Sequence, residues 1–151
     1  MLRSELSDSL KDALKAKEQH AVSTLRLILA ALKDRDIAAR SKGNCDGIPE
    51  EEILEMLQKM IRQRRDSIEL YKQGKREELA DKEAKEIEVI ERFLPQPLAE
   101  EEMQGAIREV MGELDAKSIK DMGKVMAALK ERFSGRMDFG RASAIVKEKL
   151  A

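Results

Sequence analysis

The apolar residues of this chain recur three and four positions apart along most of its length, and this spacing constrains the fold more than any other feature. Such spacing places apolar side chains on one face of a helix, whereas a half-buried strand needs strict alternation. No stretch of the sequence alternates in that way. Because strong helix formers also dominate the composition, the sequence predicts an all-α protein.

Four helices are predicted in the first 94 residues, over about 2–17, 22–40, 50–73 and 76–94. Residues 41–49 contain two glycines, Asn and Asp and therefore form a clear break, and Pro49 fits the first turn of the next helix. The positions expected to be buried are Leu2, Leu6, Leu10 (or Ser9), Ala13/Leu14, Val22, Leu25, Ile28, Leu29, Leu32, Leu79, Ile87, Ile90, Phe93 and Leu94.

The predicted helix 50–73 carries apolar residues in a seven-residue rhythm, with Arg64 at the one polar position of the series. This pattern is typical of a helix that packs against partner helices. The helix is therefore a candidate docking surface for a protein partner or for a second copy of the chain. The apolar positions of the seam are Leu54, Leu57, Ile61, Ile68 and Tyr71.

Pro95-Gln96-Pro97 marks the main boundary, because proline cannot continue a helix and disfavours helical backbone in the residue before it. We expect an N-terminal helical bundle or hairpin domain over 1–94 and a C-terminal three-helix domain over 98–151. The last three helices begin near Glu100, at Lys120 and after the turn Ser134-Gly135-Arg136. Their expected buried positions are Met103, Ile107, Val110, Met111, Leu114, Met122, Val125, Met126, Leu129, Phe133, Phe139, Ala142, Val146 and Leu150.

Charge is distributed unevenly along the chain, although the formal net charge is only −1. Residues 117–151 contain nine Lys or Arg and four Asp or Glu, whereas residues 77–116 contain four and thirteen. The near-neutral total argues against a protein that coats nucleic acid along its whole surface. A local basic surface at the C-terminal end can still attract an anionic partner.

Catalytic, metal and cofactor sites receive no support from the residue types. His20 and Cys45 are the only histidine and cysteine, so a zinc site of His and Cys ligands cannot be assembled. Gly123-Lys124 lacks the earlier glycine and the following Ser or Thr of a phosphate-binding loop. With no possible intrachain disulfide, no charged and apolar leader and no long apolar run, we expect a cytoplasmic protein that does not enter membranes.

The string Asp121-Met122-Gly123-Lys124-Val125-Met126, followed by Gly135-Arg136 and an acidic residue, resembles the signature of the GatB/YqeY family. That family comprises free-standing YqeY-like proteins and the tail of the GatB subunit of tRNA-dependent amidotransferase. The resemblance extends upstream through Leu25-Arg26 and 93–98. Phe139 departs from it where a second glycine commonly follows the aspartate, and Ala99 departs from it where Ser or Thr usually caps the helix.

The resemblance implies a non-catalytic adaptor that binds tRNA or another structured RNA through its basic C-terminal hairpin. The implied phosphate contacts are Lys120, Lys124, Lys130, Arg132, Arg136 and Arg141. Glutamine-dependent carbon–nitrogen ligase activity, which the resemblance also suggests, is expected only within a larger complex. A protein-interaction module and an accessory amidotransferase subunit are the alternatives. Two explanations of Gly123 are open: tight helix packing, which we favour, or a backbone surface that RNA can approach closely.

Overall fold

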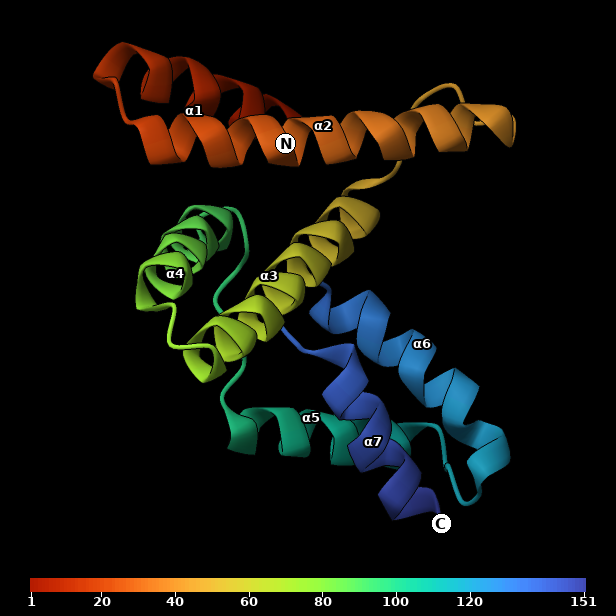
Figure 1. Cartoon of the computed structure of the whole chain (residues 1–151). Helices are drawn as coiled ribbons and strands as arrows, with labels where there is room; N and C mark the ends of the chain where they lie inside the picture. Colours follow the sequence, from red (N-terminus) through yellow and green to blue (C-terminus); the bar gives the residue numbers. More distant parts are fainter. The chain divides into compact units, whose positions relative to one another are not determined.

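A computed structural model describes residues 1–151 and confirms the all-α prediction (Figure 1). It contains seven α-helices, one short 3₁₀ helix and no strand. The elements are α1 (Leu2–Ala16), α2 (Gln19–Ser41), α3 (Glu50–Gln73), α4 (Glu77–Glu91), α5 (Glu100–Glu113), η1 (Ile119–Asp121), α6 (Met122–Phe133) and α7 (Phe139–Leu150).

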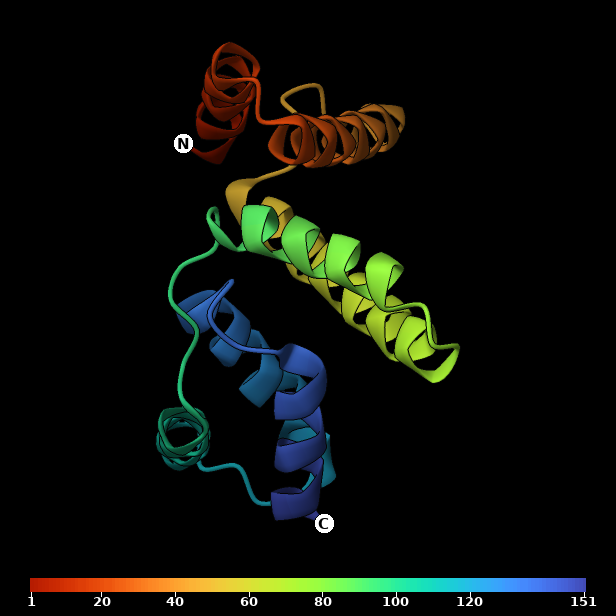
Figure 2. The same ribbon diagram turned by 60° about the vertical axis from the view of Figure 1, so that its left-hand side comes forward.

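The chain divides into two compact units, Met1–Leu94 and Pro95–Ala151. In the first unit, α1 and α2 lie side by side as one antiparallel pair and α3 and α4 as another (Figures 1 and 2). Helix α2 also packs against α4, so the two pairs share a core. The buried apolar residues of this core are Leu2, Leu6, Ala13, Ala21, Val22, Leu25, Ile28, Leu32, Ile48, Ile53, Met56, Leu57, Met60, Ile61, Ile87, Val89 and Ile90.

The buried face of α3 differs from the predicted seam. The structure buries Ile53, Met56 and Met60 beside Leu57 and Ile61, which is the wide stripe of a helix in a globular core. Ile68 and Tyr71, in the second half of the helix, are only half-buried. The predicted seam residues Leu54 and Ile68 pack against the shared core, but burial is deeper in the first half of α3 than in the second. The seam residues that are buried face the unit's own core and offer no exposed docking surface.

An ion pair lies at the polar position of α3. The Arg64 guanidinium donates to the Glu86 carboxylate of α4 at 2.9 Å and to the Met60 carbonyl at 3.2 Å. The Glu83 carboxylate lies 3.9 Å from Arg64 Nε, the nitrogen that donates to Glu86. Arg64 and Glu86 side chains are only 13% and 11% exposed, so this pair joins α3 to α4 in a largely water-free setting.

Another polar cluster fixes the loop between α2 and α3 to α1. The Arg3 guanidinium forms a bidentate ion pair with the Asp36 carboxylate, with hydrogen bonds of 2.6 and 2.7 Å. It also donates to the Ile48 carbonyl at 2.9 Å. The Ile48 amide donates to the same carboxylate at 2.9 Å. Gly47 lies against the cluster with φ +87°, and an added Cβ would lie 2.6 Å from an Arg3 nitrogen. Only glycine fits this position without moving the ion pair.

One predicted helix boundary and two predicted buried positions need correction. Helix α4 ends at Glu91 rather than at Leu94, and residues 92–94 form turns that lead to Pro95. Leu14 and Leu114, both expected to be buried, are 47% and 42% exposed. Leu114 lies just after the last residue of α5, so the helical spacing no longer directs its side chain inward.

The second unit is a hairpin of α6 and α7 with α5 packed across it (Figures 1 and 2). Its core contains most of the positions that the helical spacing predicts, and it adds Met137 from the turn, which is 2% exposed. Because Met137 lies in the turn before α7, it belongs to no helical repeat of apolar residues. The buried residues are Met103, Ala106, Ile107, Val110, Val125, Leu129, Met137, Ala142, Val146 and Leu150.

Candidate nucleic-acid interface

The first part of the family motif forms the start of α6. The Asp121 carboxylate accepts hydrogen bonds from the backbone amides of Lys117 and Ser118 at 3.0 and 3.3 Å. Ser118 and Asp121 together form a capping box around η1. These two hydrogen bonds lower the pKa of the Asp121 carboxyl, and the one from the Lys117 amide has the larger effect. Asp121 therefore holds the backbone in place, and its carboxylate is already occupied.

The second part of the motif forms the turn between α6 and α7. Gly135 has φ +78°, as expected for a glycine in a tight turn, and is buried. The Arg136 guanidinium donates to the Gln96 carbonyl at 3.0 Å, and the Arg136 carbonyl accepts from the Leu98 amide at 2.9 Å. The acidic residue that follows, Asp138, caps α7 by accepting from the amides of residues 140 and 141. This half of the motif thus ties the turn to residues 96–98.

Gly123 lies on the solvent face of α6, and an added Cβ would have no atom within 4 Å. Tight helix packing, the explanation that we favoured, is therefore wrong. Ala127 is exposed one turn further along the helix, and Lys124 and Lys130 are exposed on the same solvent-facing half. The result is a low helical surface of small side chains, flanked by Lys124, Lys130 and the exposed Glu131.

The three candidate lysines differ from the three candidate arginines. No ion pair in the structure involves Lys120, Lys124 or Lys130. Lys120 lies in η1 and α6 begins at Met122, so the predicted helix start at Lys120 needs correction. The structure still places Lys120 and Lys124 on consecutive elements at the start of the hairpin.

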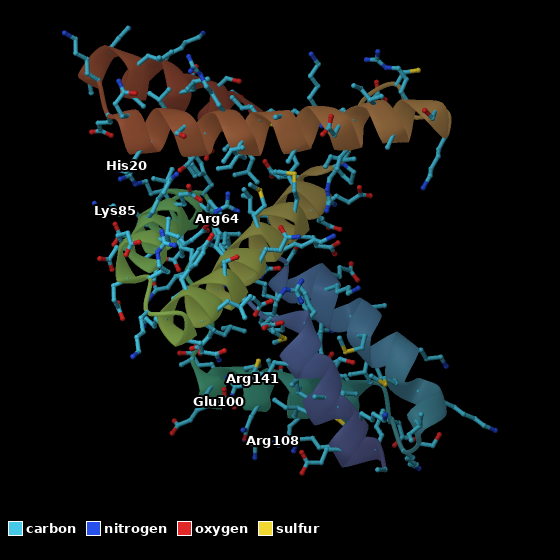
Figure 3. The ribbon with its side chains drawn as sticks, in the orientation of Figure 1. His20, Arg64, Lys85, Glu100, Arg108 and Arg141 are labelled. Atoms are coloured by element: carbon cyan, nitrogen blue, oxygen red, sulfur yellow. The ribbon has the colours of Figure 1, made fainter.

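Two of the candidate arginines pair with glutamates of α5. Arg132 donates to the Glu113 carboxylate at 2.6 Å, and Arg141 lies 2.7 Å from the Glu100 carboxylate, a pair that Figure 3 shows at one end of α5. The Arg132 hydrogen bond lowers the pKa of Glu113 and raises that of Arg132. Both pairs are about half-exposed, so they are weak and sensitive to salt.

The second unit as a whole carries no excess charge. Residues 95–151 contain ten Lys or Arg and ten Asp or Glu, because α5 brings acidic side chains against the basic hairpin. The basic character that the hairpin shows in the sequence is therefore reduced where α5 lies beside it. It persists at η1 and the solvent face of α6, where Lys120, Lys124 and Lys130 define what we call the lysine face.

The remaining candidate groups are isolated. His20 lies at the start of α2 with an exposed side chain (Figure 3), and Cys45 is an exposed free thiol in the loop before α3. No three His, Cys, Asp or Glu side chains come close enough together to hold a metal ion. None of the helices is long and apolar enough to span a membrane.

Comparison with known proteins gives consistent matches along both units. A family model described as "Yqey-like protein" matches residues 3–150. The protein named "Altered inheritance of mitochondria protein 41, mitochondrial" from Saccharomyces cerevisiae is 31% identical over 134 residues, which cover 76% of this chain and 70% of that protein. The protein of the same name from Clavispora lusitaniae is 29% identical over 149 residues, which cover 97% of this chain and 83% of that protein.

Proposed function

This chain belongs to the YqeY-like protein family, and from that membership we propose that it is a non-catalytic adaptor that binds tRNA or another structured RNA through the lysine face of its second unit. The observation that carries the proposal is the position of Lys120, Lys124 and Lys130, which have no intramolecular ion pair, beside the exposed backbone of Gly123. Lysines of this kind neutralise phosphates and position an RNA without reading its bases.

The resemblance to the tail of the GatB subunit directs the proposal toward RNA. Stacking on unpaired bases has little support, since the chain has no Trp, one Tyr and three Phe. Phe133 and Phe139 are half-buried against the core of the second unit. A folded RNA that presents its ribose-phosphate backbone therefore fits this surface better than a single strand.

The arginines have a smaller part in this proposal than the sequence suggested. Arg132 and Arg141 would have to exchange a carboxylate for a phosphate, and the Arg136 guanidinium already binds the Gln96 carbonyl. The lysines need no such exchange. We therefore assign the dominant phosphate contacts to Lys120, Lys124 and Lys130.

The test measures tRNA binding to the full chain across a series of salt concentrations. For the unchanged chain we expect log affinity to fall linearly with log salt, with a slope of roughly 0.9 per phosphate neutralised, the value known for duplex DNA. Replacing the three lysines by Ala lowers the slope by up to about 3. The matched control replaces Lys147 and Lys149, exposed lysines of α7 in the same unit, and leaves most of the slope intact. Equal losses in both variants would contradict a localised interface.

Gly123→Ala separates RNA contact from folding. A glycine in a helix costs about 0.5–1 kcal/mol relative to Ala, and a Cβ meets no atom here, so the substitution stabilises the second unit. If RNA phosphates approach the bare backbone, the same substitution weakens tRNA binding. Gly112→Ala in α5 is the matched control, because its Cβ is equally unobstructed and the residue lies outside the lysine face. An unchanged affinity in the Gly123 variant would remove the backbone contact from the proposal.

Cytoplasmic residence stays a prediction, since the fungal relatives carry mitochondrial names. Imaging of the tagged full-length chain in its own cells addresses the point directly. The binding proposal holds for either location, because tRNA and other structured RNAs occur in both.

A further inference from the structure

The first unit contains a cavity of about 530 Å³, widely open to solvent, between α1, the start of α2 and the end of α4. This volume lies within the range of about 300–1,000 Å³ that is usual for ligand pockets. The cavity is separate from the lysine face, which belongs to the other unit. Its lining residues are Glu5, Asp8, Ser9, Asp12, Ala13, Ala16, Glu18, Ala21, Leu25, Val89, Arg92 and Phe93.

The floor of the cavity is apolar and its rim is acidic. Ala13, Ala21, Leu25 and Val89 are buried core residues, and Phe93 is half-buried beside them. On the rim, α1 and the turn that follows it contribute four carboxylates, all exposed. Arg92, at the end of α4, is the one basic residue of the lining. An occupant therefore needs an apolar body and several positive charges, which it would place on the α1 side, away from Arg92.

Three of the four rim carboxylates form no ion pair within the protein. No ion pair involves Asp8, Asp12 or Glu18, and Glu5 is paired only with the exposed terminal ammonium at 3.5 Å. Glu5, Asp8 and Asp12 are spaced three and four residues apart on α1, so their side chains share one face of the helix.

The spread of the carboxylates decides which cation fits. Glu5 and Asp12 are about 10 Å apart along the helix axis at about 1.5 Å per residue. No three of the carboxylates come together closely enough to hold a metal ion. A compact ion could therefore contact only part of the rim. A linear chain of amines separated by methylene groups can reach all of it and can lay its methylenes on the apolar floor.

We propose that this cavity binds a linear aliphatic polyamine, with its ammonium groups on the rim carboxylates and its methylene groups on the floor formed by Ala13, Ala21, Leu25, Val89 and Phe93. The inference rests on cavity shape, burial and charge in the first unit. It is independent of the proposed RNA binding and stands or fails separately from it.

The experiment titrates spermidine into the full chain, freed of RNA, by isothermal calorimetry at low ionic strength. We expect saturable binding of one spermidine per chain. Hexaamminecobalt(III), which carries the same charge without methylene groups, binds at least about ten-fold more weakly, because it cannot use the apolar floor. Equal affinity for the two cations would overturn the proposal, and so would the absence of saturable spermidine binding.

Paired variants locate the site. Asp8→Asn with Asp12→Asn preserves side-chain size and weakens spermidine binding about ten-fold, through the loss of two charge contacts. Asp81→Asn with Glu88→Gln changes the net charge equally on the exposed side of α4 and leaves binding unchanged. Thermal unfolding of both variants establishes that they are folded. Equal weakening in the two pairs, or binding of a lysine-rich peptide in place of spermidine, would contradict the assignment.

Discussion

The two units use charged and capping residues differently. In the first unit, no N-cap residue caps its own helix with its side chain, and the ion pairs Arg3–Asp36 and Arg64–Glu86 are partly or largely buried. In the second unit, a capping box precedes α6, Asp138 caps α7, and the ion pairs are exposed. Both units have an apolar core; the larger one adds buried ion pairs to it, whereas the smaller one adds a capping box, one capped helix and a fixed turn.

The largest test of this contrast removes one fully buried leucine from each core. Leu57→Ala and Leu129→Ala each cost about 2–5 kcal/mol, since both side chains are 0% exposed. The smaller unit has less stability to lose. We therefore expect Leu129→Ala to remove amide exchange protection from α5–α7 while α1–α4 stay protected. Loss of protection throughout the chain in this variant would show that the units do not unfold separately.

The next test compares a buried ion pair with an exposed one. Arg64→Ala leaves the Glu86 carboxylate largely buried without its partner and lowers the unfolding free energy by about 2–3 kcal/mol. Arg132→Ala breaks an exposed pair and costs less than about 1 kcal/mol. Urea unfolding of each variant provides the measurement. The double change Arg64→Met with Glu86→Leu should recover most of the loss; if it does not, the ion pair is not the cause.

A smaller loss of unfolding free energy is expected at acidic pH. The Arg3 hydrogen bonds, helped by the Ile48 amide, lower the pKa of Asp36 to about 2. A carboxyl with a depressed pKa stabilises the fold above its unfolded pKa, and this contribution disappears as pH falls from about 4 to 2. Because the pair is partly exposed, we expect a loss of about 1–2 kcal/mol in the first unit.

The measurement is the stability difference between the unchanged chain and Asp36→Asn as a function of pH. The difference should be constant above pH 5 and shrink toward pH 2, because other titrating groups are common to both proteins. A difference that is unaffected by acid would mean that the Arg3–Asp36 contact adds no stability.

Much of the helical architecture could be predicted from the sequence because each helix carries its own apolar stripe. The bounds of α3, 50–73, were correct, since Pro49 and Gly74 flank it. The shallower burial of its second half could not be predicted, because the depth of burial depends on which neighbouring helices extend alongside. Met137 was missed for a related reason: a turn residue has no repeat that reveals burial.

The candidate site shows the same limit. The sequence identified the lysines of the hairpin and the glycine beside them, but charge counted by segment could not show that Glu113 and Glu100 meet Arg132 and Arg141 across helices. The open position of Gly123 also depends on packing that no local pattern reveals. Residue types predicted a basic surface, and only the tertiary contacts reduced it to the lysine face.

The structural work done by the family motif has a practical consequence for genetics. Asp121, Gly135 and Arg136 each hold the backbone of the second unit through amides, a turn or a carbonyl. A screen for inactive alleles will therefore collect substitutions at these three positions whose defect is low protein abundance. Inactive alleles at Lys124 that leave protein abundance normal would instead test the proposed contact with RNA.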